Sequence, residues 1–400
     1  INFETPASKM DRIRMQGENP PHGGGQQPVI GEQPQKQTII VAANTPWVQQ
    51  LEIWMMPQGF LRAAAARNAT AASQTVGGKK MTVVTFMGEN KAKVNGYIND
   101  QNLVEKVETW IDNAVLGDML FEAAYSDYKD FGGVKFPMKI VQKQGDYPIF
   151  DLTVSDVKPN APVALDLPAS VAQAPPPTVD VQKVAEGLWS LNAANTRSLA
   201  VEFADHVVML EGPTSDARSV AVNEVVRKTI PNKPIRYVVN THAHYDHAGG
   251  LRAYVAEGVT VITQEANKPF FEQVWARPRT LQPDAQSTSP KNVMIETVGD
   301  KKVLADASRT LELYHMKNSG HNTATLIAYL PKERVLMYGD GYNPPAGDDP
   351  RDPTRTPEYG LQLIEAVKQL KLSPSRIAPV HGRVVPFENL KIAVGAGTTS

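Results

Sequence analysis

The sequence predicts an α/β protein, in which a domain of interleaved strands and helices follows a smaller, mainly antiparallel β domain of the α+β type. Three observations favour this fold class. Short runs of alternating apolar and polar residues fill the first part of the chain, helix-like periods interleave with strands in the second part, and a proline-dense segment separates the two. A length of 400 residues also exceeds what one hydrophobic core usually needs.

The region before the proline-dense segment is expected to have two parts. Residues 1–45 are polar and rich in Pro, Gly and Gln, which predicts an extended N-terminal arm. Residues 46–157 contain β-rich runs, which predict an antiparallel sheet with strands at 81–87, 93–98, 119–128, 135–142 and 149–157. Apolar residues at four-residue spacing predict one amphipathic helix over 102–112, namely Leu103, Val107 and Ile111.

A stiff linker at 158–178 is expected to join this domain to the next, because prolines at this density fit neither a helix nor a sheet. The second domain is expected over 179–400. Its predicted strands cover 199–203, 206–211, 235–240, 259–263, 310–314, 324–330, 334–338 and 377–380, and its predicted helices cover 216–230, 250–257 and 360–370. Strands and helices in this order imply helices packed on the faces of a sheet.

Composition excludes several classes of function. The formal net charge is −1 and no long run carries one sign, so neither a nucleic-acid partner nor an anionic membrane surface is expected. The chain has no cysteine, which excludes disulfides, thiolate metal ligands and a cysteine nucleophile. No run approaches the roughly 20 apolar residues that span a bilayer.

The sequence opens at Ile1 rather than Met, as expected after removal of a signal peptide, so a periplasmic or secreted protein is expected. A trimmed chain is the alternative.

Four potential metal ligands lie within six residues, directly after an apolar strand: His242, His244, Asp246 and His247. A loop that leaves the carboxyl end of a strand lies where α/β folds usually bind ligands. Imidazole nitrogens and carboxylate oxygens are ligands that zinc accepts. His242 and His244, two residues apart, can share one metal, whereas Asp246 and His247 turn toward a second.

Three further candidates, His321, Asp340 and His381, adjoin the ends of predicted strands, and each has a glycine beside it that lets the backbone approach closely. A single histidine is more often a surface or core residue than a ligand. Of the eight histidines, however, five fall at these strand ends, which chance does not explain. The remaining three are expected to bind no metal, namely His22, His206 and His315, the last at most supporting a ligand from behind.

With these residues the sequence resembles the metallo-β-lactamase superfamily. An HxHxDH block, a His preceded by Gly, an Asp flanked by Gly and a late strand-end His occur in that order over about residues 180–395. The resemblance implies an αββα sandwich with two metals at one edge of two facing sheets. It also implies which ligands belong together: one metal is bound by His242, His244 and His321, the other by Asp246, His247 and His381, and Asp340 bridges both.

The pattern is similar to superfamily members whose site is built from His and Asp alone. These include glyoxalase-II-like hydrolases, lactonase-like hydrolases and the β-lactamase subclass that lacks a cysteine ligand. Glu211 departs from the pattern, because Asp is commoner where the second strand ends. The chain also lacks a basic patch after the site of the kind that binds glutathione, which argues against that substrate.

The first domain has a resemblance of its own. Residues 117–162, which include the segments 125–129 and 157–160, are similar to a region ahead of this hydrolase domain in some exported bacterial proteins. Their pattern looks like lipoprotein-carrier folds, which wrap a curved sheet around an apolar cavity. The alternative is an antiparallel platform that only supports the catalytic domain or a homo-oligomer.

The resemblance implies a metal-dependent hydrolase with two Zn²⁺ ions, Fe or Mn being the alternatives. Two cations about 3.5–4 Å apart can share a bridging water, lower its pKa to about 7 and so supply a hydroxide that attacks a carbonyl carbon. Asp246 is expected to orient this hydroxide and relay its proton, and Asp340 is expected to fix the separation of the metals. The expected substrate is a small-molecule ester, lactone or amide, β-lactams included, so a β-lactamase proper and an acyl-homoserine lactonase are the specific alternatives.

Functions of another class stay open beside this one. They are iron-dependent persulfide oxidation and a lipid-carrier protein with a vestigial site; phosphodiester cleavage is less expected, because the chain is not basic.

The loops 276–292 and 341–359 are long enough to cover the site. Substrate contacts are expected from Tyr342, Asn343 and Trp275. Trp275, with Phe270 and Phe271, forms either an apolar wall or the buried face of a short helix.

Overall fold

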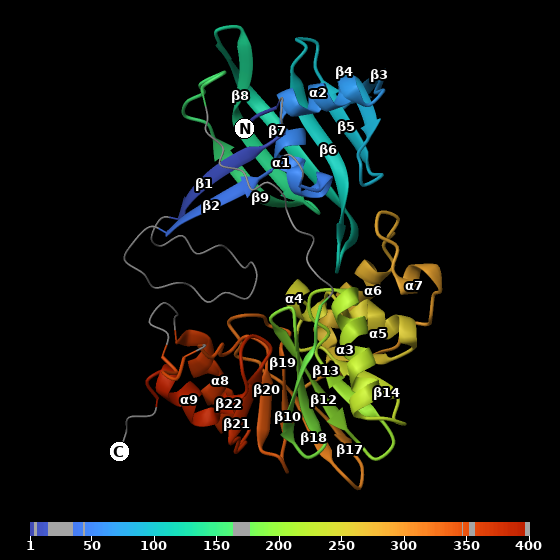
Figure 1. The fold of residues 1–400 in the computed structure, drawn as a ribbon, viewed down its shortest axis with the longest axis vertical. Helices are drawn as coiled ribbons and strands as arrows, with labels where there is room; N and C mark the ends of the chain where they lie inside the picture. Colours follow the sequence, from blue (N-terminus) through green and yellow to red (C-terminus); the bar gives the residue numbers. More distant parts are fainter. Residues whose placement is uncertain are drawn as a thin grey trace. The chain divides into compact units, whose positions relative to one another are not determined.

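A computed structural model describes residues 1–3, 6–14, 35–42, 45–162, 177–345, 347–351 and 357–396. These residues form two compact units (Figure 1). One unit draws its described residues from Ile1–Met15, Pro34–Ala174 and Pro278–Gln282, and the other from Pro175–Arg277 and Pro283–Ser400. Most of the predicted linker lies outside the described residues. No helix in the described ranges is long and apolar enough to cross a membrane.

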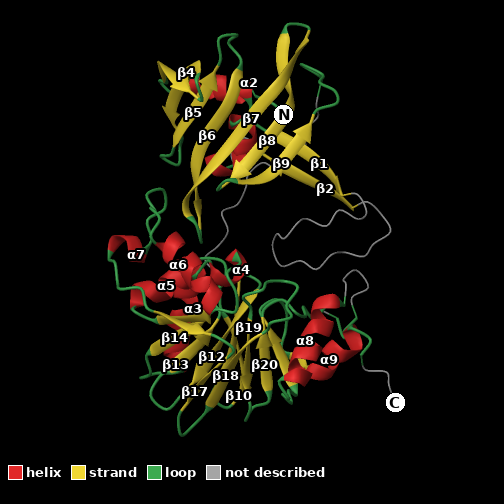
Figure 2. Ribbon diagram, turned by 180° about the vertical axis from the view of Figure 1, so that it is seen from behind, coloured by secondary structure: helices red, strands yellow, loops and turns green. Residues whose placement is uncertain are grey.

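The first unit is built on an antiparallel sheet whose seven strands follow one another in sequence order (Figure 2). Its strands are β3 (Thr70–Val76), β4 (Lys79–Met87), β5 (Lys93–Ile98), β6 (Val104–Asn113), β7 (Gly117–Phe131), β8 (Val134–Gln144) and β9 (Tyr147–Thr153). The five predicted strands correspond to β4, β5, β7, β8 and β9. The expected antiparallel domain is therefore present, with two more strands than predicted.

The predicted helix over 102–112 is wrong, because these residues form β6. A spacing of four is a multiple of the strand period of two, so it places side chains on one face of a strand as readily as on one face of a helix. Val107 is fully buried in this sheet. The helices of the unit lie earlier in the chain, at η1 (Trp47–Gln50), α1 (Leu51–Trp54) and α2 (Pro57–Ala66), and Phe60 of α2 is buried in the same core.

Part of the predicted N-terminal arm also has regular structure. Strand β1 (Ser8–Arg14) pairs antiparallel with β2 (Gln35–Val41), in a register that places Ser8 opposite Val41 and Arg14 opposite Gln35. These two segments of the predicted arm are therefore extended, and they pair with each other. The Pro, Gly and Gln residues that suggested it fall mainly in 15–34, which lies outside the described residues.

The second unit contains two sheets. The first has the order β10 to β16, with antiparallel pairing from β10 to β13 and parallel pairing from β13 to β16. Its strands are β10 (Asp180–Ala185), β11 (Leu188–Ala193), β12 (Thr196–Glu202), β13 (Val207–Leu210), β14 (Ile235–Val239), β15 (Thr260–Gln264) and β16 (Ile295–Val298). The second sheet comprises β17 (Lys301–Ala305), β18 (Thr310–His315), β19 (Leu326–Leu330), β20 (Val335–Tyr338), β21 (Arg376–Pro379) and β22 (Val385–Pro386).

The main core of this unit lies between its two sheets. Val201 and Val239 of the first sheet share one buried cluster with Leu313 and Met337 of the second. Helices cover the outer faces: α3 (Asp216–Thr229) and α5 (Leu251–Glu257) lie on the side of the first sheet, and α8 (Glu358–Gln369) and α9 (Phe387–Ala393) on the side of the second (Figure 1). The expected αββα sandwich is confirmed. Each predicted strand and helix of this domain corresponds to an element of the structure, with ends that differ by at most three residues.

Candidate metal centre

The first four candidate ligands lie on the loop between β14 and α5, which contains the short helix α4 (Tyr245–Ala248). The side chain of Asn240 fixes this loop: its Nδ2 donates to the carbonyl oxygens of His242 at 2.7 Å and of His247 at 3.3 Å. The second sheet holds the loop from the other side, because the amide of Leu326 donates to the carbonyl oxygen of Thr241 at 2.8 Å. The loop is therefore anchored at the edge where the two sheets meet.

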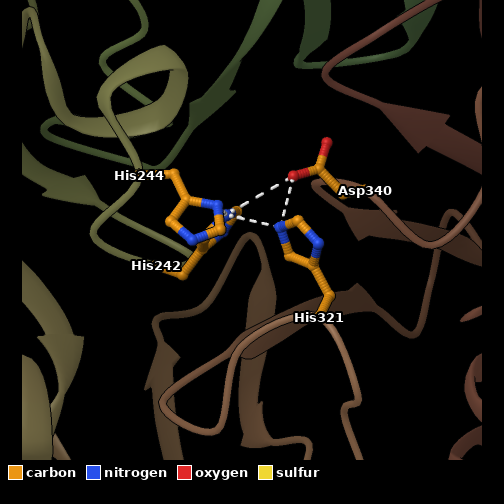
Figure 3. Close-up of side chains that lie close together, drawn as sticks. All are labelled: His242, His244, His321 and Asp340. Atoms are coloured by element: carbon orange, nitrogen blue, oxygen red, sulfur yellow. Dashed lines mark hydrogen bonds and ion pairs between the residues drawn. The ribbon is translucent and has the colours of Figure 1, made fainter. Parts of the chain in front are cut away.

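One group of potential ligands comprises His242, His244, His321 and Asp340, drawn in Figure 3. The Nε2 atom of His242 lies 3.0 Å from Nδ1 of His244 and 3.1 Å from Nε2 of His321. Oδ2 of Asp340 lies 2.9 Å from Nε2 of His321 and 3.4 Å from Nε2 of His242. Four donor atoms from three separate segments of the chain thus converge on one point.

The second group comprises Asp246, His247, Asp340 and His381. Nε2 of His247 lies 3.0 Å from Oδ2 of Asp340 and 3.6 Å from Oδ2 of Asp246. Nε2 of His381 lies 3.1 Å from Oδ2 of Asp246 and 3.3 Å from Oδ1 of Asp340. Asp340 therefore belongs to both groups, in the position expected of a bridging ligand.

The donor set fits divalent metal ions. Within each group the ligand atoms all lie within 4.8 Å of one another. Several of these atoms are buried without a hydrogen-bond partner among the described residues, which include both carboxylate oxygens of Asp340 and the Nε2 atoms of His247 and His381. Unpaired polar atoms are costly to bury, so their convergence is accounted for if a cation satisfies them. Nitrogen and oxygen donors of this kind suit zinc and its neighbours.

The remaining ring nitrogens are oriented by buried neighbours. Glu211 is fully buried at the end of β13; its Oε2 lies 3.0 Å from Nδ1 of His247, and its Oε1 accepts the amide of Thr241 at 2.7 Å. Oγ1 of Thr241 lies 3.0 Å from Nδ1 of His242. Such contacts fix which nitrogen of an imidazole faces the metal. The Glu that departs from the commoner Asp thus still reaches the site.

Protonation of the site follows from burial and from its charges. Burial lowers the pKa of His242 to about 3, so this imidazole is neutral at pH 7, as a metal ligand must be. Burial also opposes a charge on His247, but Asp340 and Glu211 outweigh it and raise the pKa of His247 well above its ordinary value. Burial would raise the pKa of Asp340, but His247, His242 and His321 hold that pKa well below its usual range. A metal bound by His247 would replace its proton, so metal binding is expected to release a proton there.

Gly339 makes room for this arrangement, and Gly339→Ala is expected to disturb the second ligand group. A Cβ atom at this position would lie 2.8 Å from Cε1 of His247 and 3.1 Å from Oγ1 of Thr241. His247 has little freedom to move away, because Glu211 holds its other side. We expect roughly tenfold weaker binding of the second metal, measured by zinc titration against a chromophoric chelator. Gly347→Ala is the matched control, since nothing lies within 4 Å of the added Cβ; equal affinities in the two variants would contradict this role.

The three residues expected to contact the substrate differ in how deeply they are buried. Trp275 is buried and stacks on Phe271 at 4.9 Å between ring centroids, on α6 (Lys268–Trp275), so of the two alternatives the buried face of a short helix is the one observed. Tyr342 is buried in the core beneath α8, and its hydroxyl donates to the carbonyl oxygen of Pro350 at 3.2 Å. Asn343 is partly buried, and its Oδ1 has no partner among the described residues.

The structure describes the first predicted loop in full and the second only in part. The first includes α7 (Ala285–Thr288), while Pro278–Gln282 belongs to the first unit. The second lies partly outside the described residues, which omit 346 and 352–356. Of the histidines expected to bind no metal, His206 pairs with Asp205 at 2.6 Å and His315 contacts the carbonyl oxygen of Thr323 at 2.8 Å, whereas His22 lies outside the described residues.

Two residues at the start of α8 support the predicted ligand His321, and the sequence did not predict them. The ring of Tyr359 packs edge-on against His321, with 5.4 Å between centroids. Oε1 of Gln362 accepts the amide of Gly320 at 2.8 Å, next to the ligand. Neither residue belongs to a motif near a strand end. Only the packing of α8 brings them to the site, so no local signal in the sequence indicates them.

The chain is similar to a known protein family and to several solved structures. Residues 211–381 match the family model of the metallo-beta-lactamase superfamily, and no curated protein matches the chain. A metallo-beta-lactamase from Pontibacter korlensis is 17% identical, with 56% of this chain and 100% of that chain covered and a TM-score of 0.42. A metallo beta lactamase from Hirschia baltica is 18% identical, with coverage of 56% and 99% and a TM-score of 0.41. A metallo-beta-lactamase from Pseudomonas aeruginosa, solved in the mono-zinc form, is 16% identical, with coverage of 56% and 96% and a TM-score of 0.40.

Proposed function

On the premise that this chain carries a domain of the metallo-β-lactamase superfamily, we propose that it is a dinuclear zinc hydrolase. The proposed reaction cleaves an ester, lactone or amide bond of a small molecule, β-lactam-like bonds included. The observation that carries the proposal is the pair of four-residue ligand groups that share Asp340. A site for one metal would need only one of them. Both groups are complete, which favours a two-metal hydrolase over a single-iron oxidase.

Bound metal ions supply an activated water and polarise the carbonyl group of the substrate. The protein positions the metal ligands through the hydrogen bonds that anchor the 240–247 loop and through the buried contacts of Glu211 and Thr241. Asp246 is suited to accept a proton: burial would raise its pKa, but His381 and His247 lower it, so the carboxylate is ionised at neutral pH. Its Oδ1 atom, buried without a partner among the described residues, is free for this role.

The accessible side of the site is formed by His381 and His244. The side chain of His381 is 26% exposed, whereas those of His242, His247 and Asp340 are 0–1% exposed. His244 is partly exposed as well. We therefore place the scissile bond on this side, next to Asp246.

A hydrolysis screen tests the proposal. Zinc-loaded protein is offered nitrocefin, acyl-homoserine lactones of several chain lengths and simple aryl esters, and turnover is followed by absorbance or by acid release. We expect turnover of at least one class, its loss of more than 100-fold after chelation, and its return when Zn²⁺ is restored. Protein that binds two metals but turns over nothing in the panel would contradict the proposal. Oxygen uptake with a persulfide by iron-loaded protein would favour the oxidase alternative.

A further inference from the structure

Arg218 of α3 is a buried cation that belongs to neither ligand group. Its side chain is 1% exposed, although arginine is almost never fully buried unless its charge is matched. Burial lowers the pKa of Arg218 to about 10, while Tyr254 and Glu211 oppose this change, so the guanidinium keeps its charge at neutral pH. Among the groups that stabilise this charge, Glu211 is the one that also contacts the metal centre.

The guanidinium of Arg218 donates three hydrogen bonds, all to neutral acceptors. Nε donates to the carbonyl oxygen of Ala193 at 3.1 Å, and Nη2 donates to that of Thr196 at 2.8 Å. Nη1 donates to Oγ of Ser198 on β12 at 3.0 Å. A guanidinium is a rigid plane of donors without an acceptor, so these contacts fix its position and leave Ser198 as the acceptor of the third bond.

Ser198 connects this cation to Glu211. Ser198 is fully buried, and its Oγ donates to the carbonyl oxygen of Glu211 at 2.9 Å. A hydroxyl has one hydrogen to donate, and Arg218 cannot accept it, so Arg218 directs that hydrogen toward Glu211. A buried chain of hydrogen bonds therefore runs from the guanidinium to the backbone of the residue that contacts His247.

The backbone of Glu211 has a conformation that needs such support. Its φ is +75°, in the left-handed region that residues other than glycine rarely adopt. A conformation of this kind persists where the surrounding structure holds it. The amide of Glu211 donates to the carbonyl oxygen of Val239 at 2.7 Å, and Ser198 holds the carbonyl group. In this conformation the carboxylate reaches both the amide of Thr241 and Nδ1 of His247.

We propose that Arg218 and Ser198 are positioning residues for the second metal, acting as a relay that ends at Glu211. Arg218 orients the hydroxyl of Ser198, Ser198 holds the backbone of Glu211, and the carboxylate of Glu211 then fixes the ring of His247. The inference rests on the proposed metal centre, but neither residue of the relay belongs to a ligand group. Because the carboxylate of Glu211 contacts the ring of His247, the effect should fall mainly on the second ligand group.

Ser198→Ala tests the proposal in competition titrations of the full chain with zinc and a chromophoric chelator. We expect the second metal to bind about tenfold more weakly and the first to change by less than about twofold. Ser190→Ala is the matched control, because Ser190 is equally buried on the neighbouring strand β11 and its Oγ has no hydrogen-bond partner among the described residues. The control should retain both affinities. Equal weakening of both metals in Ser198→Ala, or no weakening, would overturn the proposal.

A double variant shows whether Ser198 acts through Glu211. Glu211→Ala removes the carboxylate that the relay positions, so the addition of Ser198→Ala should not weaken the second metal further. Losses that multiply would show independent roles and would overturn the proposal. If Glu211→Ala fails to fold in a thermal melt, Glu211→Gln takes its place. Cobalt-substituted protein gives a second readout, since Ser198→Ala should change the absorption bands of the second metal, which a mere loss of stability would leave unchanged.

Arg218→Lys tests the other end of the relay. Lysine keeps the charge but lacks the planar fork, so it cannot reach Ser198 and both carbonyl oxygens together. We expect the same selective loss, and this variant replaces Ser198→Ala if the latter fails to fold. These readouts need bound metal but no turnover. A chain that binds two zinc ions and hydrolyses nothing would contradict the hydrolase alone, unchanged affinities in folded relay variants would contradict the relay alone, and the lack of a second metal would contradict both.

Discussion

Replacement of Asp340 by alanine is expected to lower hydrolysis by several orders of magnitude and to leave at most one metal per chain. This carboxylate is fully buried, and its two oxygens contact histidines of both ligand groups at 2.9–3.4 Å. Its loss removes one donor from each group and the only side chain that the two groups share. It also removes the negative charge that contributes most to raising the pKa of His247, so that pKa should fall.

The measurement pairs activity with metal content by elemental analysis. Asp349→Ala is the matched control, because the carboxylate of Asp349 is 58% exposed and pairs only with the nearby Arg351 among the described residues. The control should retain both metals and full turnover. Asp340→Ala with two metals and undiminished activity would refute the bridging role.

Glu211→Gln is expected to have the next largest effect. The substitution keeps an oxygen that can accept the amide of Thr241, but it removes the negative charge beside Nδ1 of His247. Contacts of this kind usually change metal affinity by about 10–100-fold when they are lost. We expect that loss mainly for the second ligand group, to which His247 belongs, while the group with His242, His244 and His321 retains its metal.

Competition titrations with a zinc chelator separate these two affinities. The control is Glu272→Gln, whose carboxylate is 57% exposed and lies 3.8 Å from Lys268. A purely structural role for Glu211 would lower the thermal stability of the variant and weaken both metals alike. A selective loss of the second metal is the result that a positioning role predicts.

The second unit could be predicted from sequence because its candidate metal ligands lie at strand ends. The seven candidate ligands follow or precede runs that are short, apolar and bounded by glycine. They could therefore be assigned to one edge of the sheets before the pairing of the strands was known. Glu211 was visible for the same reason, as the residue after β13. Tyr359 and Gln362 were not, because a helix presents them to the site through packing alone.

The first domain shows where such prediction fails. The four-residue spacing in 102–112 suits both helix and strand, and the neighbouring antiparallel strands decide in favour of β6. Strands β1 and β2 were hidden by the polar composition of the residues between them.

The central claim is that seven side chains hold two metal ions, and the metal stoichiometry of the unaltered protein tests it most directly. Metal-free protein titrated with Zn²⁺, and analysed by elemental analysis after removal of free metal, should contain two zinc ions per chain and should release protons as they bind. A single iron per chain that zinc does not displace, or no tightly bound metal at all, would contradict the account.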